Sequence, residues 1–198
     1  MAVMVRNALI NWGRGHPDSA YLACGILKLE GAADVNPVHP QGGPDGGVDI
    51  FCTYQGVACV AAVHFPNDAT SVSFAKIRKK FAGDLAGLQK NGRDGFLFVT
   101  NVPLSKAEND ELERDGTSAG SKLTMIFSLE RLVAVFTDPR SWVLRRDYLG
   151  IELTMADTLA ATQAMLLDER RAREEHQGKI QADLARILDH LGLKGESK

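Results

Sequence analysis

The chain has 198 residues, of which 44% are hydrophobic and 24% charged, and its formal net charge is -2. These values predict one sizeable core with an additional helical element, and they exclude a protein that is drawn to nucleic acid by its overall charge. The sequence has no run near the roughly 20 apolar residues of a membrane span and no signal-peptide pattern at its start. We therefore expect a cytoplasmic protein without a membrane segment.

The N-terminal half predicts a helix, an edge strand and a hairpin, in that order. Pro17 suits the first turn of a helix, and apolar residues follow it at helical spacing until Gly31. Residues 32–40 contain a proline within the run, so they fit an edge strand. The hairpin follows, with residues 47–54 and 56–65 as its two arms.

The pairing within this hairpin can be counted from its turn. If Gln55 and Gly56 form a two-residue turn, residues equally distant from the turn face each other. Cys52 then faces Cys59, and a cross-strand disulfide is geometrically possible. An odd number of cysteines without CxxC spacing favours the other interpretation, in which they are small buried side chains in a reducing compartment.

The rest of the compact part alternates helices and strands. Apolar residues at every third or fourth position from Phe74 predict an amphipathic helix that ends near Asn91. The continuous apolar run at residues 96–101 predicts a strand that is covered on both faces. Further predicted elements are a helix that starts with a capping box at Ser105 and Glu108, a strand at 123–128, and helices at 129–136 and 141–149.

Residues 155–193 predict one long and largely polar helix. Its apolar positions near the C-terminus are Ile180, Leu184, Ile187 and Leu191. Their spacings of four and three are the pattern of a coiled-coil seam, which charged residues interrupt after about two heptads. Two interpretations stay open: the helix packs its end on its own domain, or it forms a homo-oligomer. We divide the chain into a domain at 1–152 and a possible dimerisation helix at 153–198.

The predicted order of elements resembles the αβββαβ core of the restriction-endonuclease-like fold, the PD-(D/E)xK superfamily. The segment GGPDGGVDI, the basic helix AKIRKKFAGDL and the strand GFLFVTN are similar to the Mrr-type branch. That branch has a glycine-rich DGGxD, a Q/E-x-K on the next strand and TN after a buried strand. The resemblance covers roughly residues 16–101. It implies an α/β fold with a mixed sheet followed by C-terminal helices, and a Mg²⁺- or Mn²⁺-dependent endodeoxyribonuclease in defence against foreign DNA.

The chemistry of such a site needs two acidic groups that hold a divalent cation, and a lysine that stabilises developing charge. Asp49 is the predicted metal ligand on the first arm. Counting from the turn places Asp49 opposite Ala62, with His64 two residues further on the same face. The (D/E)xK positions therefore read Ala62-Val63-His64. The second arm lacks its acid, and a mostly neutral imidazole replaces the ammonium group.

Residues outside the two arms could complete this site. Asp45 lies in the glycine-rich loop, where an ordinary turn role is the alternative interpretation. Lys80 and Asp84 lie one turn apart on the helix that begins at Phe74. The predicted catalytic residues are Asp49, His64 and Lys80. The predicted ligands of Mg²⁺ or Mn²⁺ are Asp49, Asp45 and Asp84.

Basic residues on the same helix predict a contact with DNA. Lys76, Lys79 and Lys80 lie on one side of it with Arg78 nearby, so they could neutralise phosphates, although a solvated helix face also explains them. A second basic group contains Arg140, Arg145 and Arg146. Two functions stay open: a nuclease-like domain that acts on or binds DNA with a weakened or lost metal site, and a catalytically inactive binding or assembly module that recognises a protein partner or nucleotide.

Overall fold

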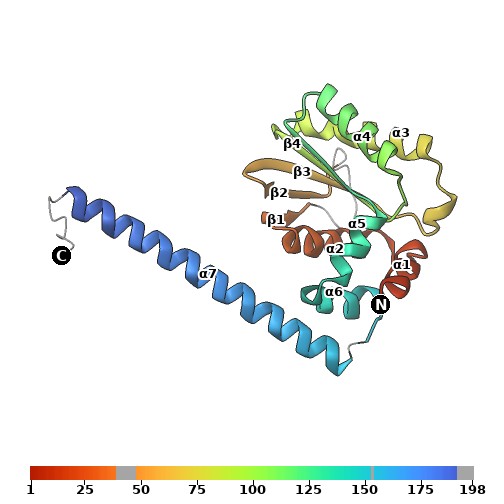
Figure 1. Cartoon of the computed structure of the whole chain (residues 1–198). Coiled ribbons are helices and arrows are strands. Elements are labelled where there is room, and N and C mark those ends of the chain that lie inside the picture. The colour runs from red at the N-terminus through yellow and green to blue at the C-terminus, as the bar shows by residue number, and fades with distance from the viewer. Residues whose placement is uncertain (39–47, 153, 191–198) are drawn as a thin grey trace. The chain divides into compact units, whose positions relative to one another are not determined.

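The computed structural model describes residues 1–38, 48–152 and 154–190. It divides into two units, Met1–Leu153 and Thr154–Lys198. The first unit is an α/β domain in which a five-stranded mixed sheet lies between two layers of helices (Figure 1). The described part of the second unit is one long helix.

The elements of the first unit follow the predicted order from residue 17 onward. Its strands are β1 (Ala33–Pro37), β2 (Ile50–Tyr54), β3 (Val57–His64), β4 (Gly95–Thr100) and β5 (Leu123–Phe127). Its α-helices are α1 (Ala2–Ile10), α2 (Gly15–Leu29), α3 (Phe74–Lys90), α4 (Lys106–Ser118), α5 (Leu129–Thr137) and α6 (Trp142–Leu149). Two short 3₁₀ helices are η1 (Ala69–Ser71) and η2 (Pro139–Ser141). The helix α1 was not predicted.

The sheet has the strand order β1-β2-β3-β4-β5. The pairs β1/β2 and β2/β3 are antiparallel, whereas β3/β4 and β4/β5 are parallel. Parallel neighbours need a crossover connection, and α3 and α4 provide the two crossovers. The strand β1 lies at one edge, as Pro37 predicted, and every residue of β4 is buried, as its apolar run predicted.

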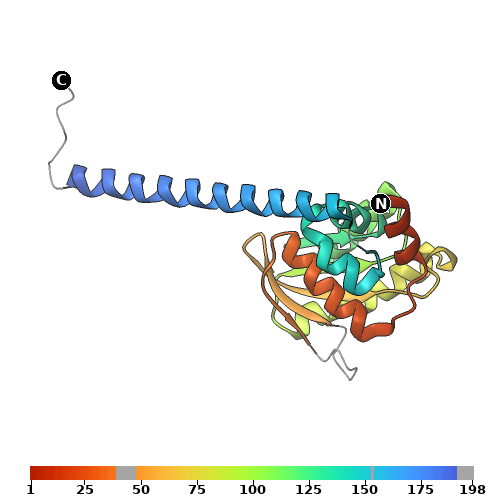
Figure 2. The same ribbon diagram turned by 90° about the horizontal axis from the view of Figure 1, so that it is seen from below.

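Two separate cores cover the two faces of the sheet. Residues of α1, α2 and α5 pack on one face, which includes Ala61 and Val63 of β3. Residues of α3 and α4 pack on the other face, which includes Val60 and Ala62. This alternation along β3 is the period of a strand that is buried on both sides. Figure 2 shows the first layer from below, in which α2 packs on the strands and α6 packs on α2.

The hairpin has the predicted turn. Gln55 and Gly56 both have positive φ, 49° and 77°, as a type I′ turn requires. Its register matches the prediction from Ile50 to Tyr54, and each residue there faces the expected partner on β3. The sequence therefore sets the strand pairing through the turn.

The three cysteines are buried and free. Cys52 faces Cys59 across the hairpin, as predicted, without a bond between the two sulfurs. Burial raises the pKa of Cys24 to about 11 and that of Cys52 to about 12. These thiols stay protonated near neutral pH, so they behave as small apolar side chains and not as nucleophiles.

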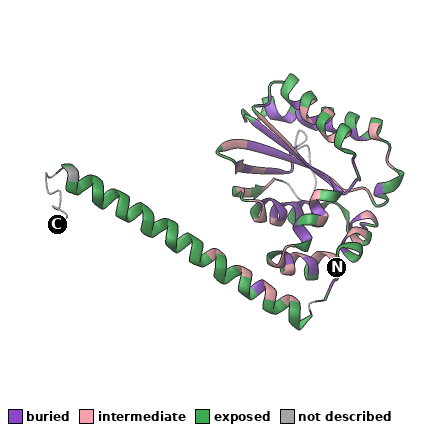
Figure 3. Ribbon diagram, in the orientation of Figure 1, coloured by how far each residue is buried: buried purple, intermediate pink, exposed green. Residues whose placement is uncertain are grey.

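The helix α7 (Met155–His190) makes up the described part of the second unit. Its 36 residues correspond to a length of about 54 Å at 1.5 Å per residue. Most of its side chains are exposed (Figure 3). Among the described residues, no helix is both long enough and apolar enough to cross a bilayer.

Two helical glycines should respond in opposite ways to replacement by alanine. A Cβ at Gly83 in α3 would meet no atom within 4 Å, whereas a Cβ at Gly116 in α4 would fall on the Thr124 side chain, 2.6 Å from its Cγ2. Gly83→Ala should raise the free energy of unfolding by about 0.5–1 kcal/mol because alanine loses less backbone entropy. Gly116→Ala should lower it by roughly 1–3 kcal/mol through overpacking. Urea unfolding measures both, and equal signs would contradict this packing of α4.

Candidate functional site

A pocket of about 260 Å³ lies where β3 ends. Its wall is formed by the start of α2, the residue before β2, the end of β3 with the following loop, and α3. The residues that line it are Gly15, His16, Ser19, Asp49, Val63, His64, Phe65, Pro66, Asn67 and Lys80. The fold thus brings together the three predicted catalytic residues Asp49, His64 and Lys80 from distant parts of the chain.

The backbone at Asp49 departs from the register of the hairpin. Ile50 faces Ala61, but the N–H of Asp49 also donates to the carbonyl of Ala61, at 3.0 Å. Two residues of one strand therefore oppose one residue of the other, which is the geometry of a β-bulge. The predicted pairing of Asp49 with Ala62 is wrong for this reason, because counting from the turn assumes an unbroken ladder.

The carboxylate of Asp49 is buried, with 5% of the residue exposed. Its Oδ2 accepts a hydrogen bond from the backbone N–H of Val63, at 2.6 Å. Its Oδ1 lies 3.1 Å from Nε2 of His16. A buried carboxylate is tolerated when both oxygens have hydrogen-bond donors. The side chain of Asp49 therefore links the end of β3 to the start of α2.

His16 was not among the residues that sequence reasoning selected. Gly15 has a φ of +80°, which lets the chain turn sharply into α2. The indole N–H of Trp12 donates to the carbonyl of Gly15 at 3.1 Å, and the ring of Trp12 meets that of Phe65 edge-on at 5.4 Å. The hydroxyl of Ser19 donates to the carbonyl of His16 at 2.8 Å. These contacts hold the imidazole at the pocket.

His64 and Lys80 form the opposite part of the wall. Burial lowers the pKa of His64, and the charge of Lys80 lowers it further. The imidazole of His64 is therefore mainly neutral near pH 7. The ammonium group of Lys80 donates to Oδ1 of Asp84 at 2.6 Å, and the Asp84 side chain is buried below it. Lys80 is thus oriented by an acid of its own helix, one turn further along.

The TN pair after β4 has a structural role at the same end of the sheet. The hydroxyl of Thr100 donates to the carbonyl of His64 at 2.7 Å. The side-chain amide of Asn101 donates to the carbonyl of Pro66 at 3.0 Å and to that of Leu9 at 2.7 Å. These bonds fix the chain that leaves β3, and with it the rim of the pocket.

The described residues bring together only part of the predicted magnesium site, because Asp49 lines the pocket whereas Asp84 is not among its lining residues. Mg²⁺ is held by oxygen ligands, usually with one or two carboxylates. Among the described residues that line the pocket, Asp49 supplies the only carboxylate, and both of its oxygens already have donors. No group of three or more His, Cys, Asp and Glu side chains in the described ranges could hold a metal ion. Asp45 lies outside the described residues.

Some of the predicted basic residues are exposed, and others are paired or buried. Lys76 and Lys79 are exposed on α3. The guanidinium of Arg78 donates to Asp115 of α4 at 2.7 Å and pairs with Glu111 of the same helix, so it holds α3 to α4. The second basic group does not form a surface patch, because Arg145 is only 2% exposed.

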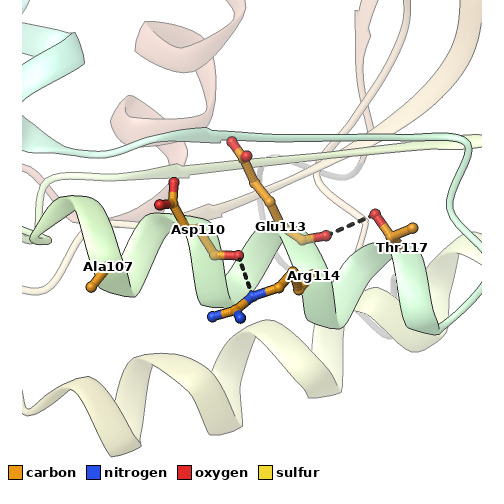
Figure 4. A pocket seen from close by; sticks show the side chains of 5 residues that line it. All are labelled: Ala107, Asp110, Glu113, Arg114 and Thr117. Atoms are coloured by element: carbon orange, nitrogen blue, oxygen red, sulfur yellow. Dashed lines mark hydrogen bonds between the residues drawn. The ribbon is translucent and has the colours of Figure 1, made fainter.

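A larger hollow of about 580 Å³ lies along α4, and we assign no site to it. Figure 4 shows that its five lining residues come from this one helix. The guanidinium of Arg114 donates to the carbonyl of Asp110 at 3.2 Å, and the hydroxyl of Thr117 donates to that of Glu113 at 3.0 Å. These side chains bond to their own helix and do not converge on a ligand.

Comparison of the chain with models of protein families, with curated proteins and with solved structures returned no match.

Removal of the Asp49 carboxylate should destabilise the fold. Asp49→Ala leaves the buried N–H of Val63 without its acceptor, so the free energy of unfolding should fall by roughly 1–3 kcal/mol. Asp49→Asn keeps an acceptor oxygen and should cost less. Asp110→Ala is the control, because this exposed carboxylate forms a surface pair with Lys106. Urea unfolding measures all three, and equal losses for Asp49→Ala and Asp110→Ala would contradict the assignment.

His64 should titrate below the ordinary histidine pKa of about 6.5. Lys80→Gln should raise the pKa of His64 only in part, since burial is the larger cause of the shift. Because the folded state binds this proton less tightly than the unfolded state, the contribution of His64 to stability is lost as the pH falls below about 6.5. NMR titration of the imidazole protons measures the pKa, and a value above 6.5 in the folded protein would refute the expectation.

Proposed function

We propose that the Met1–Leu153 unit is a restriction-endonuclease-like domain that binds DNA and has lost most or all of its metal-dependent cleavage. The observation that carries the proposal is the pocket at the end of β3. There Asp49 just before β2, His64 of β3 and Lys80 of α3 line one cavity. A role in defence against foreign DNA follows from the Mrr-type resemblance alone.

The topology supports the family part of the proposal. The order α2, β1, β2, β3, α3, β4 reproduces the αβββαβ order of the PD-(D/E)xK core. Its three antiparallel strands are followed by a parallel β4. The helices α2 and α3 contribute to cores on opposite faces of the sheet.

The donor set supports the loss of metal chemistry. One oxygen of the Asp49 carboxylate accepts from the backbone N–H of Val63, and the other lies against the imidazole of His16. A cation would have to displace these partners to bind the carboxylate. The β3 residues beside it, Ala61, Ala62 and Val63, offer no side-chain oxygen whichever register is considered. The acid that the (D/E)xK pattern requires on this strand is therefore missing.

The basic side chains of α3 support DNA as the ligand. Lys76 and Lys79 are exposed, and 43% of the Lys80 side chain is exposed at the pocket. Lysine ammonium groups neutralise phosphates without reading the base sequence, so the expected binding is salt-dependent and largely independent of DNA sequence. The overall charge of -2 leaves this local group as the source of attraction.

DNA binding by the full chain in EDTA tests the first half of the proposal. Fluorescence anisotropy with a labelled duplex should show affinity that falls steeply with salt. The triple variant Lys76→Gln, Lys79→Gln and Lys80→Gln should bind roughly tenfold or more weakly, with a salt slope shallower by about two to three. The control variant Lys28→Gln, Lys106→Gln and Lys122→Gln removes the same charge from other exposed positions. Equal losses in the two variants would refute a specific surface on α3.

Plasmid nicking with Mg²⁺ or Mn²⁺ tests the second half. The wild-type chain should nick no faster than Asp49→Asn, and both should bind DNA alike. Metal-dependent nicking that disappears in Asp49→Asn would show an intact nuclease and overturn the loss of cleavage. Absence of salt-dependent DNA binding would instead favour the alternative of a module that recognises a protein partner or nucleotide.

A further inference from the structure

The helix α7 carries an exposed apolar stripe in one continuous heptad frame. Ile180 and Ile187 occupy position d of this frame and Leu184 occupies position a. Their exposed fractions are 47%, 56% and 51%. The same frame places Leu159 and Leu166 at position d, with 61% and 60% exposed. These five apolar residues of the helix thus lie in one heptad frame.

Polar residues interrupt this stripe between Leu159 and Ile180. Gln163, Arg170 and Gln177 lie at position a, and Arg173 lies at position d. Polar residues at a and d positions lower the stability of a coiled coil but fix its register. They do so because a shifted register would bury them against apolar residues of the neighbouring helix. The stripe therefore has one apolar block at Ile180, Leu184 and Ile187, two leucine layers at Leu159 and Leu166 on either side of Gln163, and polar layers from Arg170 to Gln177 between them. This uneven order of layers is a pattern that can recognise a copy of itself.

The charges in the centre favour a second copy of this chain as the partner. Arg170 pairs with Glu174 at 2.9 Å and Arg173 with Glu169 at 2.6 Å, each within the helix. In a parallel coiled coil, position a is flanked by position g of the next helix, and position d by position e. Glu169 is at g and Glu174 is at e, so the same acids of a neighbouring copy would flank both arginines. A copy of α7 thus supplies complementary charge at the layer where burial is most costly.

The direction of the copies follows from the order of the layers. In a parallel arrangement without a shift, apolar layers meet apolar layers and polar layers meet polar layers. An antiparallel arrangement that places Arg170 against Arg173 also places Leu166 against Gln177 and Ile180 against Gln163. That arrangement leaves two apolar residues against amides, so the parallel arrangement buries more apolar surface.

The number of copies follows from which residue type occupies each position. Leucine at a with isoleucine at d favours assemblies of more than two strands, and this is the arrangement of Leu184 with Ile180 and Ile187. Leu167 and Leu188 lie at position e, beside the seam, with 57% and 42% exposed. A two-stranded coil would leave these leucines largely in water, whereas a four-stranded bundle covers a wider stripe.

We propose that α7 joins four copies of this chain in a parallel, unshifted helical bundle. This inference does not depend on the proposed DNA binding, because it uses only residues of α7. If the DNA-binding proposal also holds, four tethered domains would bind one duplex with higher avidity than a single domain.

Mass measurement on the full chain by sedimentation equilibrium tests the proposal. The wild-type mass should be four times the 21.5 kDa of one chain. The double variant Ile180→Asp and Leu184→Asp should be a monomer. The control variant Ala182→Asp and Ala185→Asp adds the same charge at positions f and b, which face away from the seam, and should stay a tetramer. Trp12 and Trp142, the two tryptophans of the chain, lie in the first unit, so their fluorescence checks that this unit stays folded in each variant.

A second variant tests the number of copies without introducing charge. Ile180→Leu, Leu184→Ile and Ile187→Leu exchange the residue types at a and d, and this order favours two strands. The mass should fall to half that of the wild type. A monomeric wild-type chain would overturn self-association, and a dimeric wild-type chain would overturn the tetramer. A tetramer that survives Ile180→Asp with Leu184→Asp would show that surfaces other than α7 hold it together.

Discussion

The carboxylate of Asp49 is the interaction on which the arrangement of the site depends. Asp49 directly precedes β2. Its carboxylate accepts a hydrogen bond from the N–H of Val63 in β3 and also contacts the imidazole of His16 in α2. A buried charge is stable only when its oxygens are satisfied, so both elements must lie within hydrogen-bond reach. The β-bulge has the same origin, since the backbone of Asp49 bonds to Ala61 while its side chain reaches further along the same strand.

Much of the fold could be predicted because its signals are local in the sequence. The turn residues Gln55 and Gly56 set the hairpin register, and Ser105 with Glu108 forms the predicted capping box. The helix α1 escaped prediction because only Val5 and Leu9 of its nine residues are buried, too few to show a periodic pattern. A helix of this length is held by tertiary packing and not by its own propensity.

The site was predictable where a polar side chain interrupts an apolar element. Asp49 and His64 stand out in the hairpin for this reason, and Lys80 flanks the apolar stripe of α3. His16 gave no such signal, because it reaches the pocket through the turn at Gly15 and the packing of Trp12 on Phe65. These contacts join residues far apart in the sequence. Such contacts leave no regular spacing in a single sequence from which they could be predicted.

In the proposed function, DNA binding and cleavage would depend on different parts of this domain, so one could be lost without the other. Cleavage needs acids that converge on a cation, and β3 beside Asp49 offers only methyl and isopropyl groups. Phosphate attraction needs only accessible positive charge, which Lys76 and Lys79 carry on α3 whatever occupies the pocket. Arg78 is different, because Asp115 and Glu111 already compete with any phosphate for its guanidinium. If the domain binds DNA as proposed, the geometry of α3 favours contact through lysines, which would bind the DNA backbone as point charges and leave the base sequence unread.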